Sequence, residues 1–551
     1  MTASERVLCP VRLTPDHVNL GSYQQSVDGA IAKLDADRIV QRIWEADHTV
    51  WNHDPTEIID RLGWLTLPDT MRPQLRNIQR FASEVAADGI QHVVLLGMGG
   101  SSLGTETLKR CFGPIDGAPA LQVLDSTIPA AVKATRDAVD LSTTLFIVSS
   151  KSGSTIEPNV LYRYFRGLVD AAVGTEESGS RFVAITDAGT SLDVMGTDQG
   201  FRQVFRNPED LGGRYSVLSY FGLIPAAISG IDTSELSASA RAIEEACEPH
   251  IATGNNPGVW LGATLASLAG SGRDKLTLVT SPPLAGFGLW VEQLIAESLG
   301  KDARGIVPIT GEPLVEANAY GDDRLFVFLK LAGDESRELD TAQSNLEAAG
   351  HPVVVYTLDD LYALGGEFYR WEFAAAIAGR VMGVQPFNQP NVQQAKDLTD
   401  AELARFQESG DSPNNMPFDS LAMLLNSAKP GDYLAILAYI EETDESNRMF
   451  ESLRHKVIER TGIATTLGYG PRYLHCTGQL HKAGPVSGLF LEVTTGDSND
   501  VDLPGEPYSL KVLADAQSAG DGSALRAANR RFARVVLENV SDLHSLEQEL
   551  E

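Results

Sequence analysis

The sequence predicts an α/β protein. Two parallel-sheet domains with helices on both faces are preceded by an N-terminal helical segment and followed by a C-terminal α/β extension. Short apolar runs alternate with stretches of helical periodicity from residue 91 onward. The chain has 551 residues, and a single hydrophobic core stops growing at about 250–300 residues. Polar or glycine-rich loops follow several apolar runs, so we expect ligands at the carboxyl ends of the strands.

The composition excludes several classes of partner. With 44 Lys and Arg against 74 Asp and Glu, the formal net charge is −30, which repels nucleic acid and anionic membranes. No window approaches the roughly 20 apolar residues of a membrane helix, and the N-terminus lacks an export signal, so we expect a cytoplasmic protein. The four cysteines are scattered without metal-ligand spacing. Neither a metal nor a cofactor is expected.

Residues 1–85 form the predicted helical segment. Apolar residues recur at helical spacing through Ile31, Leu34 and Ile39. No pattern in this segment indicates chemistry, so we expect it to cover the domains that follow.

Residues 86–250 form the first predicted domain, in which a glycine loop follows the first strand. Strands are expected over 92–96, 121–124, 144–148 and 181–186. A dinucleotide fingerprint would need glycine in place of Ser102, and a P-loop would need a Lys-Ser/Thr pair after Gly104, so neither is predicted. Gly99, Gly100 and Ser101 instead allow a ligand close to the backbone. A tight turn without a ligand is the alternative.

The loop Ser149-Ser150-Lys151-Ser152-Gly153-Ser154-Thr155 follows the third strand and precedes a helix expected from Glu157. Free N–H groups at a helix N-terminus, several hydroxyl groups and one cation suit a phosphate. A polar turn that only caps the helix is the alternative.

Arg214 lies in a second glycine loop, Gly212-Gly213-Arg214-Tyr215-Ser216. A guanidinium held near a phosphate cradle can neutralise charge that develops on a substrate oxygen. The alternative is an arginine in a surface salt bridge.

Residues 251–400 form the second predicted domain, with strands expected over 276–280, 325–329 and 352–356. In the helix expected over 288–301, Gln293 and Glu297 are four residues apart and share a face. A carboxylate set among apolar helix residues is a candidate general base. A solvated helix glutamate is the alternative.

Residues 401–551 form the C-terminal extension, which begins after a turn-rich loop over 409–415. Strands are expected over 433–440 and 488–495, helices over 447–461 and about 524–540, and a loop over 468–485. The pattern does not decide whether these strands extend the second sheet.

Five motifs in this order resemble the phosphoglucose isomerase family. They are Gly-Met-Gly-Gly-Ser-Ser-Leu-Gly (97–104), Ser-Lys-Ser-Gly-Ser-Thr (150–155), Gly-Gly-Arg-Tyr-Ser (212–216), Gln-Leu-Ile-Ala-Glu-Ser-Leu-Gly-Lys (293–301) and Gln-Pro-Phe-Asn-Gln-Pro-Asn-Val-Gln-Gln-Ala-Lys (385–396). The resemblance implies two sugar-isomerase-type domains, a homodimer, and interconversion of glucose 6-phosphate and fructose 6-phosphate without a metal.

The resemblance also implies roles for individual residues. Glu297 corresponds to the base that moves a proton between C1 and C2, Arg214 to the arginine beside the enediolate, and Lys396 to a lysine that assists ring opening. Gln293 and Gln389 correspond to glutamines that contact the substrate. The phosphate is expected on Ser150, Lys151, Ser152 and Thr155, with Ser154, Gly99, Gly100 and Ser101 nearby.

The family's catalytic histidine is expected between the glutamate and lysine motifs, where this chain has only His351. The segment Leu474-His475-Cys476-Thr477-Gly478-Gln479 resembles the histidine segment of bacterial members, displaced to a position after the lysine. We therefore expect His475 to open the ring, with His481 as the second candidate. This arrangement resembles the isomerase part of bacterial transaldolase–phosphoglucose isomerase fusions.

A non-catalytic sugar-phosphate-binding regulator is the alternative function. It would keep the phosphate cradle but would not need Glu297 with Arg214. A DNA-linked regulator would also need a basic helix-turn-helix segment, which this acidic sequence lacks.

Overall fold

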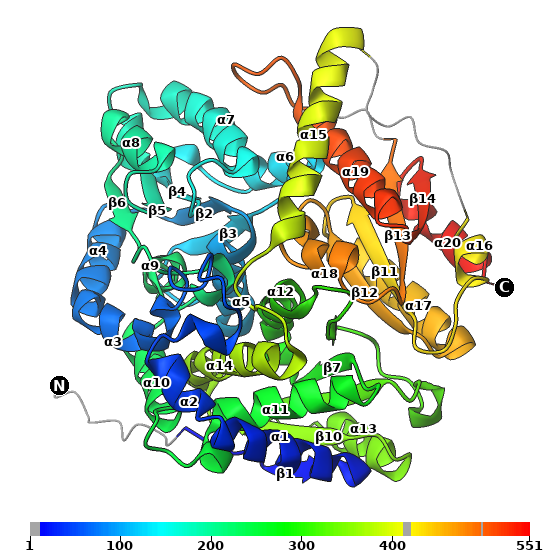
Figure 1. Cartoon of the computed structure of the whole chain (residues 1–551). Coiled ribbons are helices and arrows are strands. Elements are labelled where there is room, and N and C mark those ends of the chain that lie inside the picture. Colours follow the sequence, from blue (N-terminus) through cyan, green and yellow to red (C-terminus); the bar gives the residue numbers. More distant parts are fainter. Residues whose placement is uncertain (1–10, 335, 411–419, 497–499, 551) are drawn as a thin grey trace.

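The computed structural model describes residues 11–334, 336–410, 420–496 and 500–550. Three sheets occur in this part of the chain, two with five strands and one with four (Figure 1). The predicted α/β class is confirmed, and each sheet is formed mainly by parallel neighbours.

The first sheet has the strand order β3-β2-β4-β5-β6, with all neighbours parallel. Its strands are β2 (His92–Gly97), β3 (Ala120–Leu124), β4 (Thr144–Ser149), β5 (Phe182–Thr186) and β6 (Gln203–Arg206). The four expected strands are present, whereas the short edge strand β6 was not predicted. Alternate residues of β2 contact different hydrophobic clusters, Val93 one and Val94 the other, because helices cover both faces. These helices are α4 (Leu75–Ala87), α5 (Leu103–Phe112), α6 (Pro129–Asp137), α7 (Ile156–Val173), α8 (Ser191–Asp198) and α9 (Tyr220–Ile228).

The second sheet has the order β1-β10-β9-β7-β8. Its strands are β1 (His17–Asn19), β7 (Lys275–Thr280), β8 (Val307–Thr310), β9 (Arg324–Leu331) and β10 (Val353–Leu358). The three expected strands are present. β1 corrects the purely helical prediction for residues 1–85, because His17 pairs with Val355 in an antiparallel register. A three-residue edge strand is too short to show a period.

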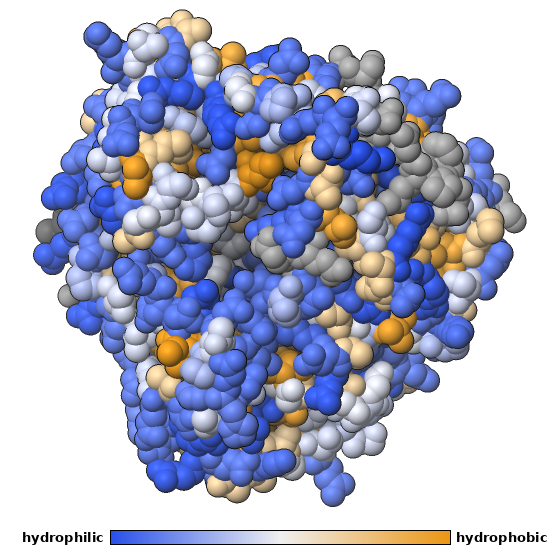
Figure 2. Space-filling view, turned by 45° about the horizontal axis from the view of Figure 1, so that its top comes forward, coloured by the Kyte–Doolittle hydropathy of each residue, from blue (hydrophilic) through white to orange (hydrophobic). Residues whose placement is uncertain are grey.

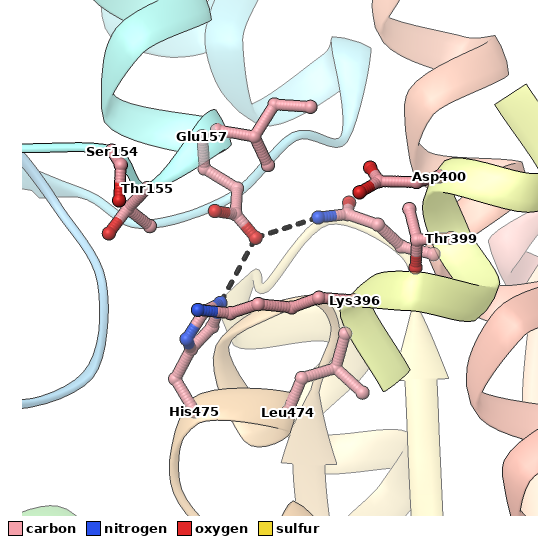
Figure 3. A pocket seen from close by; sticks show the side chains of 10 residues that line it. Ser154, Thr155, Glu157, Lys396, Thr399, Asp400, Leu474 and His475 are labelled. Carbon is pink, nitrogen blue, oxygen red and sulfur yellow. Dashed lines mark hydrogen bonds and ion pairs between the residues drawn. The ribbon is translucent and has the colours of Figure 1, made fainter. Parts of the chain in front are cut away.

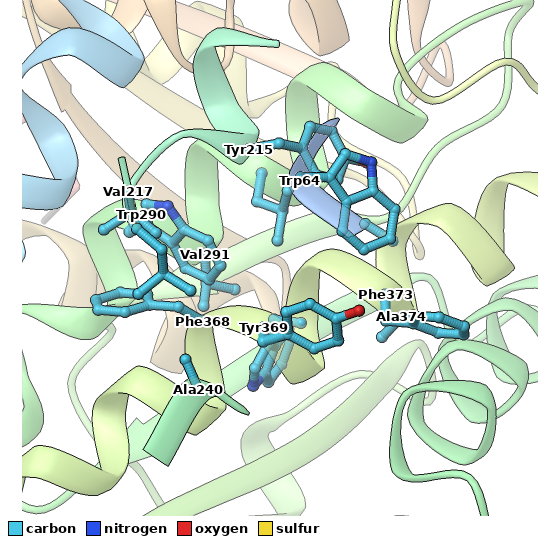
Figure 4. Packing of buried hydrophobic residues seen from close by; sticks show 14 of the residues in the cluster. Trp64, Tyr215, Val217, Ala240, Trp290, Val291, Phe368, Tyr369, Phe373 and Ala374 are labelled. Atoms are coloured by element: carbon cyan, nitrogen blue, oxygen red, sulfur yellow. The ribbon is translucent and has the colours of Figure 1, made fainter. Parts of the chain in front are cut away.

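Helices surround this second sheet and connect it to the N-terminal segment. They are α1 (Gln24–Ala36), α2 (Ile39–Trp44), α3 (Leu67–Met71), α10 (Thr233–Ala246), α11 (Pro257–Gly270), α12 (Phe287–Leu299), α13 (Arg337–Ala348) and α14 (Leu364–Met382). A buried aromatic cluster joins the N-terminal segment, the Arg214 loop and α14 (Figure 4). In it, Trp64 contacts the rings of Tyr215, Tyr369 and Phe373. This packing fixes the backbone on which Arg214 stands.

The C-terminal strands form a separate parallel sheet of order β12-β11-β13-β14, called here the C-terminal sheet. Its strands are β11 (Tyr433–Tyr439), β12 (Ala464–Tyr469), β13 (Gly488–Thr495) and β14 (Arg531–Leu537). Its helices are α16 (Leu421–Leu425), α17 (Asp444–Thr461), α18 (Gly478–Ala483), α19 (Leu510–Ala527) and α20 (His544–Gln548). β11, β13 and α17 match predicted elements, and β12 was not predicted.

The helix predicted over about 524–540 is wrong. Helix α19 ends at Ala527, and the chain then turns through Asn529, whose φ of 54° is left-handed and cannot continue a right-handed helix. The residues after this turn form β14 beside β13. The loop predicted over 468–485 is also more ordered than expected, since it contains the 3-10 helix η13 (Arg472–His475) and α18.

Helix α15 (Pro390–Ser409) runs between the first sheet's helices and the C-terminal sheet (Figure 1). Leu403 on α15 packs in one cluster with Leu161 of α7 and Leu510 of α19. Residues 411–415 of the predicted turn-rich loop lie outside the described residues.

The surface shows no large apolar patch on the face in Figure 2, where hydrophilic residues predominate and hydrophobic ones form small separate groups. None of the described helices combines the length and hydropathy that crossing a membrane requires.

Candidate active site

The glycine loop after β2 is where three distant segments meet. A Cβ atom on Gly99 would lie 3.1 Å from Gln293 Nε2 and 3.1 Å from His475 Cβ, and the φ of Gly99 is +54°. A Cβ on Gly100 would lie 2.0 Å from the carbonyl oxygen of Gly213. Glycine at both positions therefore lets α12, the Arg214 loop and the His475 segment close on one another.

Glu297 and Arg214 form a buried ion pair, with 3.3 Å between Glu297 Oε1 and Arg214 Nη1. Arg214 is therefore not an arginine in a surface salt bridge, and Glu297 is not a solvated helix glutamate. The Arg214 guanidinium also donates to Ser298 Oγ at 2.8 Å and to Gln389 Oε1 at 2.9 Å. Its Nη2 donates to two backbone carbonyl oxygens, those of Pro386 at 2.6 Å and Asn388 at 3.0 Å. The cation is therefore fixed in position beside the carboxylate.

Gln293 connects this ion pair to the histidine segment. Its Nε2 donates to Glu297 Oε2 at 3.0 Å and to the backbone oxygen of His475 at 2.8 Å. Its Oε1 is buried and has no hydrogen-bond partner among the described residues. A buried acceptor left unpaired beside a carboxylate is available to a ligand hydroxyl group.

A cavity of about 260 Å³ lies beside His475 (Figure 3). Its lining includes Ser154, Thr155, Glu157, Lys396, Asp400, His475 and Gln517. His475 Nε2 lies 3.0 Å from Glu157 Oε1. Burial alone would raise the pKa of Glu157, but the charge and hydrogen bond of His475 outweigh it, and the pKa is lowered. Glu157 is therefore a carboxylate held against an imidazole.

The His475 segment is anchored by Arg472, the first residue of η13. Its guanidinium donates to both carboxylate oxygens of Asp125, at 2.7 and 2.8 Å, and to Glu442 Oε2 at 2.6 Å. Asp125 follows β3 of the first sheet, and Glu442 follows β11 of the C-terminal sheet. Arg472 thus ties the histidine segment to both sheets.

The predicted phosphate cradle, residues 149–155, leads directly into α7. The helix begins at Ile156, the residue after Thr155. Ser150 Oγ donates to Thr155 Oγ1 at 3.1 Å, and the hydroxyl oxygens of Ser152 and Ser154 lie 3.0 Å apart. Lys151 forms a salt bridge with Asp187. The cradle's hydroxyl groups therefore bond one another, and its cation is paired.

The two other candidate histidines lie elsewhere. His481 is buried against the rings of Tyr473 and Phe490. Burial, and then the charges of Lys482 and Arg530, lower the pKa of His481 well below its usual value. His351 is also buried, with its Nδ1 3.3 Å from Arg273 Nη1. Of these three histidines, only His475 lines the cavity.

Glu157 and Gln517, which form the hydrogen bonds that lead to His475, had no assigned role in the sequence interpretation. Glu157 stands two residues after Thr155 in the cradle motif, so its position in the first turn of α7 was the available signal. Gln517 lies in the middle of α19, and no local pattern distinguishes it.

Comparisons with known proteins give the family. A family model described as phosphoglucose isomerase matches residues 68–302. The glucose-6-phosphate isomerase of Staphylococcus saprophyticus subsp. saprophyticus is 31% identical over 394 residues, covering 63% of this chain and 87% of the relative. That of Rubrobacter xylanophilus is 29% identical over 426 residues, covering 69% and 96%. The crystal structure of a glucose-6-phosphate isomerase from Chlamydia trachomatis shares the fold, with a TM-score of 0.58 at 16% identity, over 70% of this chain and 87% of that chain.

The stretch matched by the family model contains the glycine loop, the cradle, Arg214 and Glu297, and the alignment with the Staphylococcus relative covers most of that protein. The chain belongs to the phosphoglucose isomerase family.

Proposed function

We propose that the chain is a glucose-6-phosphate isomerase, which interconverts glucose 6-phosphate and fructose 6-phosphate. The reaction proceeds by ring opening and then by proton transfer between C1 and C2 through a cis-enediol(ate). The observation that carries the proposal is the buried Glu297 carboxylate 3.3 Å from a fixed guanidinium, joined through Gln293 to the histidine of a neighbouring cavity.

Glu297 is the proposed proton carrier between the two carbons. A proton α to a carbonyl is removable only when negative charge on the neighbouring oxygen is stabilised. Arg214 supplies that stabilisation, because its guanidinium is permanently charged and is held in place by four other acceptors. Gln293 and Gln389 orient the carboxylate and the guanidinium and present their amides to the sugar hydroxyls.

His475 is the proposed acid/base for ring opening. Its Nε2–H donates to Glu157, which leaves Nδ1 as the acceptor for a sugar proton. Lys396 lines the same cavity and is proposed to act near the ring oxygen. Glu157 compensates the positive charge on the imidazole when it takes up a proton.

The phosphate is proposed to bind at the N-terminus of α7. Ser150, Ser152, Ser154 and Thr155 offer hydroxyl groups there, and the helix end offers backbone N–H groups. Lys151 stands in the same loop and is proposed to share its charge between Asp187 and the phosphate.

The curated relatives are named isomerases, which supports catalysis over a non-catalytic regulatory role. We further propose a cytoplasmic homodimer that binds neither nucleic acid nor membranes. The resemblance of the C-terminal part to transaldolase–isomerase fusions stays a prediction.

The test is a coupled assay that follows conversion of fructose 6-phosphate to glucose 6-phosphate in the parent and in Glu297→Gln. We expect a loss of about 1,000-fold, since the variant keeps the shape but removes the proton carrier. The matched control is Glu292→Gln on the same helix. Glu292 is also buried, but its Oε2 accepts from Thr310 at 3.1 Å, and burial raises its pKa to about 7. Equal activity of the parent and Glu297→Gln would reject the mechanism.

A further inference from the structure

Among the described residues, Glu157 supplies the one carboxylate paired with the His475 side chain, and Gln517 binds that carboxylate. Gln517 is buried in the middle of α19, and its Nε2 donates to Glu157 Oε1 at 2.7 Å. This is the same oxygen that contacts His475 Nε2 at 3.0 Å (Figure 3). Glu157 Oε2 is buried with no hydrogen-bond partner in the described part of the chain. Both contacts therefore hold the carboxylate through a single oxygen.

The amide of Gln517 is itself fixed in orientation. Thr127, buried just after β3, donates its hydroxyl to Gln517 Oε1 at 2.7 Å. An amide has its acceptor on one side and its donors on the other, so this bond points the NH₂ group at Glu157. The series Thr127, Gln517, Glu157 and His475 thus joins the first sheet, α19, α7 and η13.

A competing cation makes this orientation matter. Lys396 lines the cavity, and its charge lowers the pKa of Glu157 after the larger effects of burial and of His475. The other charged group of the lining is Asp400, on α15 with Lys396. Without the Gln517 amide on Oε1, only the imidazole among the described side chains would hold the Glu157 carboxylate against the attraction of Lys396.

We propose that Gln517 is a positioning residue that keeps Glu157 on His475 Nε2 and away from Lys396. The inference rests on the proposed function, because the imidazole it orients is the ring-opening group. Gln517 does not touch the reacting atoms in this proposal and acts only through Glu157.

The test compares Gln517→Leu with Gln517→Glu. In Gln517→Leu we expect kcat to fall about 10- to 100-fold, the loss typical when a group that orients a metal-binding histidine is removed. The loss should be mainly in kcat rather than KM. The apparent pKa of the Glu157–His475 pair should fall, because the imidazole loses a close carboxylate. In Gln517→Glu it should rise, because a second carboxylate is added beside the first.

Two controls separate positioning from folding. Thr127→Val removes the hydroxyl group that orients the Gln517 amide. The pH profile should therefore shift in the same direction as in Gln517→Leu, but by a smaller amount. Ser518→Ala changes the next residue of the same buried helix, whose hydroxyl donates to Glu492 at 2.9 Å. It should lower thermal stability without moving the profile. An unchanged profile in Gln517→Leu, or one that Ser518→Ala reproduces, would overturn the proposal.

A second readout does not depend on turnover. Titration of the histidine proton resonances, assigned with His475→Asn, follows the same pair in the absence of substrate. Opposite shifts in the two Gln517 variants support the positioning role even if the parent shows no isomerase activity, which would reject the proposed function alone. An active parent whose titration is the same in all variants would reject the positioning role alone.

Discussion

The site contains two carboxylates that face cations, and the two pairs are built differently. Glu297 faces Arg214, whose guanidinium has four further acceptors and cannot lose its charge at any ordinary pH. Glu157 faces His475, whose side chain can carry a proton and whose Nε2 lies 3.0 Å from that carboxylate. The first pair suits a fixed charge beside an enediolate. The second suits a group that takes up and releases protons during ring opening.

The two pairs also differ in which parts of the chain supply them: both members of the first pair and Glu157 of the second come from one stretch, whereas His475 comes from another. Arg214 and Glu297 both lie inside the stretch that the family model matches, residues 68–302. His475 and Lys396 lie beyond it, on η13 and α15, and meet Glu157 from the other side of the cavity. Gln293 connects the two pairs, since it donates to both Glu297 and the backbone oxygen of His475.

The largest expected effect comes from loosening the Arg214–Glu297 pair, called here the fixed pair. Arg214→Lys keeps a positive charge but loses the planar fork that reaches several acceptors, so we expect isomerisation to fall about 100- to 1,000-fold. Exchange between the sugar anomers, followed by NMR, should fall much less because it needs only ring opening. Arg324→Lys is the control for loss of a buried guanidinium, since Arg324 pairs with Glu312 at 2.7 Å in the second sheet. Equal losses in isomerisation and in anomer exchange would contradict the assignment of Arg214 to the proton-transfer step rather than to ring opening.

A smaller effect is expected from breaking the His475–Glu157 pair, called here the titratable pair. His475→Asn should lower turnover of fructose 6-phosphate about 100-fold, because the ring must open without its proton carrier. A four-carbon aldose phosphate cannot close a six-membered ring, so its turnover should fall by much less. His455→Asn is the control, since His455 lies on α17 beside Glu459 and does not line the cavity. If both substrates lose the same factor, His475 does not act at ring opening.

The comparison also shows what the sequence could predict. The Glu297 side follows from local patterns: a four-residue helical spacing, and glycine loops after strands whose carboxyl ends meet at one edge. His475 was expected from a family motif. Its contact with Glu157 joins residues 318 apart, and the Gln517 contact joins residues 360 apart. Such pairs depend on how the C-terminal sheet packs on the first sheet, and no local period encodes that packing.

The errors in secondary structure have similar causes. The missed strands β1, β6, β8 and β12 all lie at sheet edges. The first three have three or four residues, which is too few to show a period, and β12 has six. The wrong helix over 524–540 ran through Asn529, where a left-handed turn separates α19 from β14. Apolar residues recur at helical spacing both before and after Asn529, so the sequence pattern does not reveal this turn.

The smallest expected effect concerns how the titratable pair is anchored. Burial would raise the pKa of Glu442, but Arg472 and Arg110 outweigh it and lower the pKa to about 2. A carboxylate whose pKa is lowered by folding stabilises the protein above its unfolded pKa, and this contribution is lost as the pH falls through the folded pKa. Glu442→Gln should therefore destabilise the protein at neutral pH. The difference from the parent should shrink as the pH falls from about 4.5 toward about 2.

Urea unfolding of both proteins across this range measures that difference. Glu442 binds the arginine of η13, so Glu442→Gln should also lower ring opening a few-fold while leaving Glu297 and Arg214 in place. Glu451→Gln on α17 is the control, as a carboxylate near the same region that makes no contact with Arg472 among the described residues. A pH-independent difference would mean that Glu442 acts through packing rather than charge. The fixed pair and the titratable pair would then share one rigid support, and the contrast between them would lie only in the chemistry of arginine and histidine.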